Sequence, residues 1–162
     1  MHAYLALGSL SLILLTGAIA PPKSPSIEGT YRLVSRDLPN GTKQVPPSIV
    51  GLITFTKHYR NFNIYWKDAG GKAMSISGIA TYQLTNKEYR ETNVYYLVND
   101  EIGGKGLSYD VSGSSDASPV AIKGTRIEMK FPLHGEPKVV FEGNKLTATA
   151  EGAFVDHWER VH

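Results

Sequence analysis

Apolar and polar residues alternate along most of the chain after residue 26, in short runs separated by turn residues. Sequences such as Pro39-Asn40-Gly41 and Asp68-Ala69-Gly70-Gly71 mark the turns. Short alternating strands at this spacing, with hardly a helical period, predict an all-β domain. The predicted strands cover residues 27–35, 50–57, 59–66, 73–85, 88–98, 105–112, 119–123, 126–132, 137–142, 145–151 and 153–161.

The alternation also predicts which side chains face inward. In residues 59–66, Phe62, Ile64 and Trp66 share one face, because successive side chains of a strand point to opposite sides. Residues 88–98 are ambiguous, since Tyr95 and Tyr96 are both large. In other strands the same rule predicts inward positions at Met74, Ile76, Gly78, Ala80, Tyr82, Leu84, Leu107, Tyr109, Val111, Ile127, Met129 and Phe131.

Consecutive strands joined by short turns favour an up-and-down meander over a sandwich, which would need longer crossover connections. Closure of such a meander into a barrel removes the exposed edges of the sheet. We therefore predict a single up-and-down antiparallel β-barrel of about 8–10 strands. The longest connections, residues 36–49 and 113–118, are predicted to be loops at the rim.

One stretch resembles a known family. It begins with Gly29-Thr30-Tyr31-Arg32-Leu33-Val34-Ser35, continues with Gly41-Thr42 and Pro46-Pro47, and ends with Gly51-Leu52-Ile53-Thr54-Phe55-Thr56. This order is similar to the lipocalin-like domain family, whose calycin-type barrels begin with a Gly-x-Trp-x-Leu-x-Ser strand. Tyr31 stands where that family has tryptophan, and the later Thr-Asp-Tyr motif of secreted lipocalins is missing. The chain thus resembles the broader barrel group rather than the lipocalins in the narrow sense.

The resemblance implies a structural role for four residues. In such barrels an aromatic ring at the position of Tyr31 closes one end, and an arginine packs across it. Arg160 is the candidate for that arginine here, and Gly29 and Trp158 are predicted to belong to the same closure of the barrel. A guanidinium on an aromatic face contributes about 0.5–2 kcal/mol. The alternative is that Arg160 anchors a ligand carboxylate.

Composition excludes several kinds of function. The formal charge is only +2, and the basic residues are scattered, so nucleic acid is not a predicted partner. The chain has no cysteine, which excludes disulfides, thiolate nucleophiles and cysteine metal sites.

Histidine spacing predicts no metal site. The five histidines, at positions 2, 58, 134, 157 and 162, show no paired spacing typical of metal ligands. His58 and His134 are predicted at the surface, and His157 is predicted to face outward next to Asp156. The functional alternatives to these surface positions are acid–base chemistry of His157 beside Glu159, and haem ligation by His157 or His134. No phosphate loop, dinucleotide motif or Gly-x-Ser-x-Gly elbow is present, and no cofactor or catalytic residue is predicted.

The remaining candidates line the predicted interior. A barrel of this size is wide enough to hold one small ligand, although aromatic stripes also simply fill cores. We predict that a small hydrophobic molecule binds inside, that tyrosine hydroxyls or Arg60 orient its polar end, and that loops 36–49, 67–72 and 113–118 set selectivity. The predicted ligand-binding residues are Phe55, Arg60, Phe62, Trp66, Tyr82, Tyr96, Tyr109, Phe141 and Phe154.

Two other functions fit the same pattern. One is a cofactor-independent cyclase or isomerase that folds a hydrophobic biosynthetic intermediate, since orientation alone can lower a barrier by several kcal/mol. The other is a filled barrel that serves only protein contacts.

The N-terminal residues differ from the rest. Residues 1–20 are mostly apolar or small and predict a secretory signal peptide, or else an uncleaved membrane anchor. A Pro-rich linker over residues 21–26 leads into one barrel domain at 27–162, a normal domain size. The expectation is a secreted protein that meets a membrane only through an uncleaved N-terminal segment. Asn40-Gly41-Thr42 is a glycosylation sequon or a plain hairpin turn.

Overall fold

The computed structural model describes residues 25–161, so the predicted signal peptide or anchor and most of the predicted linker lie outside the described residues. The described chain contains strands and turns and no helix. The strands are β1 (Gly29–Asp37), β2 (Lys43–Gln44), β3 (Ile49–Phe55), β4 (Tyr59–Lys67), β5 (Ala73–Leu84), β6 (Glu88–Asp100), β7 (Gly106–Asp110), β8 (Ser115–Pro119), β9 (Ala121–Lys123), β10 (Arg126–Lys130), β11 (Lys138–Glu142), β12 (Lys145–Ala150) and β13 (Phe154–Arg160).

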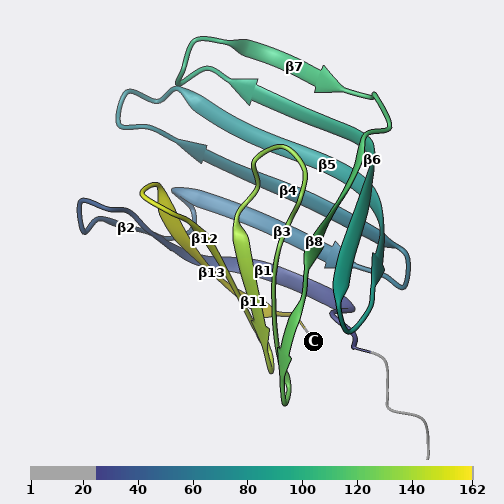
Figure 1. The fold of residues 1–162 in the computed structure, drawn as a ribbon. Helices are drawn as coiled ribbons and strands as arrows, with labels where there is room; N and C mark the ends of the chain where they lie inside the picture. Colours follow the sequence, from purple (N-terminus) through teal and green to yellow (C-terminus); the bar gives the residue numbers. More distant parts are fainter. Residues whose placement is uncertain (1–24, 162) are drawn as a thin grey trace, which may run out of the picture.

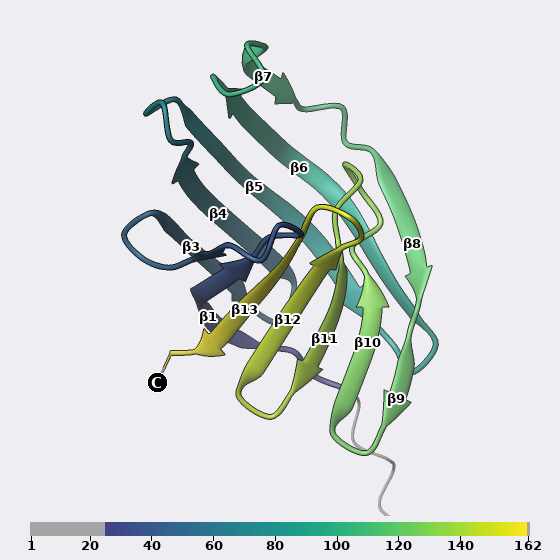
Figure 2. The ribbon, with the colours of Figure 1, turned by 90° about the vertical axis from the view of Figure 1, so that its left-hand side faces the viewer.

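The strands form one curled antiparallel sheet (Figures 1 and 2). Its order is β7-β6-β5-β4-β3-β1-β13-β12-β11-β10-β9, so the first long strand lies beside the last. The two ends of this sheet are linked by the segment 115–123, because β8 pairs with the first part of β6 and β9 pairs with β10. The predicted all-β, up-and-down, barrel-like fold is confirmed; the sheet curls as a half-barrel and contains 13 strands, where about 8–10 were predicted.

Two predictions about the segment around β7 and β8 are wrong. Residues 113–118 were predicted as a rim loop, but β8 occupies most of them. Leu107, Tyr109 and Val111 were predicted to face inward, yet they are exposed, Tyr109 at 64%. The reason is that β7 pairs with the second part of β6, beyond the part that β8 covers, and lies at the edge of the sheet (Figure 2). Alternation shows that the two faces of a strand differ, but not that either face is covered.

Two β-bulges change which residues face inward. In β1, Leu33 pairs with Trp158 and Ser35 with His157, which leaves Val34 as an extra residue. In β6, Asn93 pairs with Ala80 and Tyr95 with Ile79, so Val94 is extra. An extra residue shifts the alternation of everything that follows. Arg36 and Tyr96 therefore face the interior, which resolves the ambiguity between the two adjacent tyrosines of β6.

One end of the interior is filled by rings, which we call the aromatic plug. Its members pack with centroid separations of 5.4–6.2 Å, mostly edge to face or tilted. Such contacts add to the stability that burial of the rings supplies. The aromatic plug consists of Tyr31, Phe55, Tyr82, Tyr89, Phe131 and Phe141.

Three of the four residues predicted to close the barrel meet beside the aromatic plug. The Arg160 guanidinium lies 5.6 Å from the centroid of the Tyr31 ring. Gly29 adopts φ +142°, and a Cβ atom there would lie 2.5 Å from Arg160 Nε. Only glycine therefore leaves room for this guanidinium. Trp158 does not belong to this group, since it lines the cavity described next.

Candidate functional site: a charged aromatic cavity

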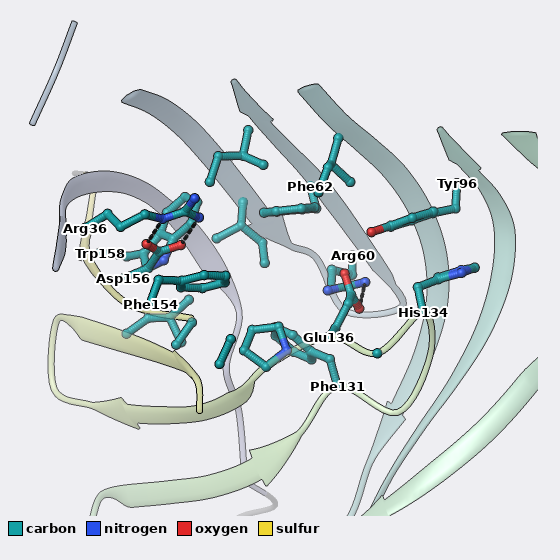
Figure 3. A pocket seen from close by; sticks show the side chains of 18 of the residues that line it. Arg36, Arg60, Phe62, Tyr96, Phe131, His134, Glu136, Phe154, Asp156 and Trp158 are labelled. Atoms are coloured by element: carbon teal, nitrogen blue, oxygen red, sulfur yellow. Dashed lines mark hydrogen bonds and ion pairs between the residues drawn. The ribbon is translucent and has the colours of Figure 1, made fainter. Parts of the chain in front are cut away.

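A partly enclosed cavity of about 180 Å³ lies beyond the aromatic plug, between β4 on one side and β12 and β13 on the other (Figure 3). Five of the nine predicted ligand-binding residues line it: Arg60, Phe62, Trp66, Tyr96 and Phe154. Three others, Phe55, Tyr82 and Phe141, belong to the aromatic plug. Tyr109 faces solvent, contrary to its predicted position.

The walls of the cavity are mainly apolar, with a few polar groups at defined places. Aliphatic side chains such as Ile53, Ile64 and Leu146 complete the aromatic lining. Ligand pockets have this character. A dry cavity of about 150 Å³ is enough to hold benzene, so the volume here suits a molecule with about seven or eight non-hydrogen atoms.

One polar group is a buried ion pair between β1 and β13. Arg36 donates from Nε to Asp156 Oδ1 at 2.6 Å and from Nη2 to Oδ2 at 2.7 Å. Its guanidinium lies 4.6 Å from the Trp66 ring centroid and 4.0 Å from that of Phe154. Burial raises the pKa of Asp156, and the hydrogen bonds and charge of Arg36 oppose that rise. The pair is held in a single geometry by two hydrogen bonds and two ring faces.

Sequence reasoning missed this pair. Arg36 fell in a predicted rim loop, and only the bulge at Val34 turns it inward. A signal existed for Asp156, because it lies between Phe154 and Trp158 at inward parity on the same strand. A carboxylate at an inward position requires a partner, since burying an unpaired charge is costly.

The second polar group joins three elements through Arg60 of β4. Its Nη2 lies 2.8 Å from Glu91 Oε1 and 2.6 Å from Glu136 Oε2. Tyr89 donates its hydroxyl to Glu91 Oε2 at 3.1 Å. All three ionic side chains are at least nine-tenths buried. We call Arg60, Glu91 and Glu136 the carboxylate triad; it contains two carboxylates and one guanidinium.

Because two carboxylates share one guanidinium, the pKa values of the buried groups are shifted. Burial raises the pKa of Glu91 to about 7, with a further rise from Glu136, although Arg60 lowers it. Burial lowers the pKa of Arg60, but the two carboxylates outweigh that effect and raise it. Burial also raises the pKa of Tyr96. Glu91 is thus partly protonated near neutral pH, while Arg60 stays charged.

Glu136 reaches the interior because the connection between β10 and β11 folds inward. His134 and Gly135 take positive φ values of 54° and 68°, a left-handed turn that reverses the chain. His134 stacks on Tyr96, with 3.8 Å between ring centroids and 7° between planes, and its Nδ1 lies 3.7 Å from Asp110 Oδ2. His134 lies at the surface as predicted, but its side chain is only 16% exposed because the ring packs on Tyr96.

Trp158 forms part of the wall next to β3. A Cβ atom at Gly51 would lie 2.7 Å from its Cη2 atom, so this glycine makes room for the indole. The indole nitrogen of Trp158 is buried and has no hydrogen-bond partner among the described residues. An unpaired buried donor is uncommon in folded proteins.

His157 lies outside the cavity. Its Nε2 is 2.8 Å from Asp37 Oδ2 across β1 and β13, and its side chain is 42% exposed. Among residues 25–161, no three histidine or acidic side chains gather closely enough to hold a metal ion. No helix long and apolar enough to cross a membrane occurs in this part of the chain.

Comparisons of the chain with models of known protein families, with curated proteins and with solved structures find no match.

Proposed function

We propose that this protein binds a small, mainly hydrophobic molecule inside a lipocalin-like barrel, in the cavity beyond the aromatic plug. The observation that carries the proposal is a partly enclosed, ring-lined space with a few buried ion pairs in its wall. The resemblance of residues 29–56 to lipocalin-like domains supports the same function.

The driving force is burial of apolar surface. A ligand that buries about 200 Å² gains about 5 kcal/mol at 25 cal/mol per Å², before the cost of immobilising it. Affinity for a purely apolar molecule is therefore modest, and the polar groups must supply the rest. The connection 131–137 is expected to set selectivity, because it contributes His134, Glu136 and Pro137 to the lining. Loops 67–72 and 113–118 contribute no lining residue.

The proposal is tested by native mass spectrometry of the protein from its own producing cells, followed by denaturing extraction. A stoichiometric small molecule is the expected result. Ala148→Leu fills the cavity and should abolish retention of that molecule, whereas Ala121→Leu on exposed β9 should not. Circular dichroism confirms that both variants fold. A clean mass for the wild type, and no binding from a panel of small hydrophobic compounds, would overturn the proposal.

A second function, a cofactor-independent isomerase or cyclase, is favoured by one observation. Glu91, whose pKa is about 7, pairs with Arg60 and accepts a hydrogen bond from Tyr89. Its neighbour across Arg60, Glu136, lines the cavity, as does Tyr96. A carboxylate that titrates near the working pH suits proton transfer. Incubation of the extracted compound distinguishes the two functions, since a carrier returns its ligand unchanged and an enzyme converts it.

A further inference from the structure

We infer that the ligand is a small organic cation, a protonated amine on an apolar body, whose ammonium group binds beside Glu136. This inference rests on the proposed binding function and names the chemistry of its ligand. It follows from the charges around the cavity, the free acceptors in its wall and the nature of its lining.

The buried charges around the cavity do not balance. Asp156 is matched by Arg36, but Glu91 and Glu136 share Arg60 alone. With all groups ionised, the set carries one excess negative charge. An uncompensated buried charge is costly, and a cation placed beside it removes that cost. An anionic ligand would instead add a fourth negative charge, and both arginines are already engaged by carboxylates.

The wall provides acceptors for an ammonium group. Glu136 uses Oε2 to bind Arg60, and no hydrogen bond to its Oε1 is present among the described residues. The Tyr96 hydroxyl points into the cavity on the same side (Figure 3) and likewise has no hydrogen-bond partner among the residues that the structure describes. An ammonium carries three donors and no acceptor, which matches two free oxygens better than a neutral or anionic group does.

The lining favours a cation over an anion. Aromatic rings present an electronegative face, which attracts a positive charge and repels a negative one. Phe62, Phe131 and Trp158 provide such rings around the cavity. The Arg60 guanidinium lies 4.4 Å from the centroid of the Phe131 ring, which shows the lining already stabilising one cation.

When no cation is bound, protonation of Glu91 reduces the excess negative charge. Burial and Glu136 raise the pKa of Glu91 to about 7, so this carboxyl is partly protonated near neutral pH and mostly protonated at pH 6. The other charged or titratable groups facing the triad are Tyr89 and Tyr96 from β6 and His134 from the connection 131–137, with Asp110 behind His134. A bound amine displaces this proton, so binding should release protons and tighten as the pH rises from about 6 to 8.

The test compares three probes of one size by isothermal titration calorimetry: benzylamine, benzyl alcohol and benzoate. Benzylamine should bind at least about tenfold more tightly than benzyl alcohol, and benzoate most weakly. Titrations at pH 6 in two buffers of different ionisation enthalpy should show proton release with benzylamine and none with benzyl alcohol. This proton count needs no variant and therefore does not depend on a mutant that folds.

A variant pair locates the site. Glu136→Gln should weaken benzylamine about tenfold and leave benzyl alcohol within about twofold, while Glu151→Gln, the same change at an exposed turn, should alter neither. Equal affinity for benzylamine and benzyl alcohol, or benzylamine binding without proton release, would overturn the cation inference and leave the binding function standing. No binding of any probe would count against both.

Discussion

The aromatic plug and the cavity are built largely from the same strands, but they differ in packing: the aromatic plug is filled by rings, whereas the cavity is open and has buried charges in its wall. In the aromatic plug, rings such as Phe55 and Phe141 approach to 5.4 Å between centroids and leave no space. In the cavity, charged groups pack among the rings, as the Arg36 guanidinium does on Trp66 and Phe154. In β1, a bulge lies between the residues that serve each region: Tyr31 precedes Val34 and Arg36 follows it. The contrast teaches that one extra residue in β1 is enough to turn a charged side chain, Arg36, in among the rings of the cavity.

The largest expected effect comes from removing a ring from the aromatic plug. Phe55→Ala should lower the free energy of unfolding by about 3–5 kcal/mol, because Phe55 is fully buried and contacts four other rings. Phe62→Ala in the cavity wall should cost only about 1–2 kcal/mol, since this ring is half-buried and already borders empty space. Urea denaturation of both variants measures the difference. Equal losses would mean that the two regions are packed alike.

The cavity should instead be sensitive to charge. Asp156→Ala leaves Arg36 buried without its carboxylate and should cost about 3 kcal/mol. Replacing both partners, as Arg36→Met with Asp156→Leu, should recover most of that loss, because paired apolar groups often match a buried ion pair. Denaturant unfolding of Asp156→Ala, of the double variant and of its two component single variants, Arg36→Met and Asp156→Leu, measures the recovery and the coupling. If the double variant is no more stable than Asp156→Ala, the stacking of Arg36 on Trp66 and Phe154 matters more than its charge.

A smaller effect is expected from pH. The pKa of Glu91 is about 7 in the folded protein and near 4.5 when unfolded. The unfolded chain therefore loses this proton first, and the free energy of unfolding should fall as the pH rises from about 4.5 to 7, by at most about 2–3 kcal/mol. Exposed carboxyls with lowered pKa, such as Asp37 and Glu101, act in the opposite direction at lower pH.

The variant Glu91→Gln should flatten that fall, because its side chain no longer titrates. Glu151→Gln serves as the control and should keep the slope of the wild type. Thermal denaturation across the range in low-salt buffers provides the measurement. A wild-type stability that rises with pH in this window would show that Glu91 is ionised well below neutrality.

Much of the fold follows from local pattern. The turns and strand positions of β3–β6 and β10–β13 were predictable because hairpin turns and alternation are short-range signals. The inward faces of β4 and β10 follow from the same rule, and Phe62, Ile127 and Met129 lie as predicted. The meeting of Gly29, Tyr31 and Arg160 was implied by the family resemblance rather than by the alternation.

The charged half of the cavity was not predictable in the same way. The inward position of Arg36 depends on a bulge that no nearby turn residue predicts. The inward position of Glu136 depends on a connection that folds into the interior instead of over the surface. Both positions are decided by long-range pairing, Arg36 with Asp156 and Glu136 with Arg60. Only Arg60 was foreseen, because its strand keeps a regular alternation.

The smallest expected effect comes from a substitution in β7, the strand whose side chains were wrongly predicted to face inward. Tyr109 on β7 carries a large ring, yet it is 64% exposed and contributes to neither the aromatic plug nor the cavity. Tyr109→Ser should therefore change the free energy of unfolding by no more than about 0.5 kcal/mol, and it should leave benzylamine binding unaltered. Tyr96→Phe, on the neighbouring strand, is the matched contrast, because it removes a hydroxyl that faces the cavity and should weaken the amine. A loss of more than about 2 kcal/mol for Tyr109→Ser is the range expected of a buried residue, and it would mean that β7 is covered in solution.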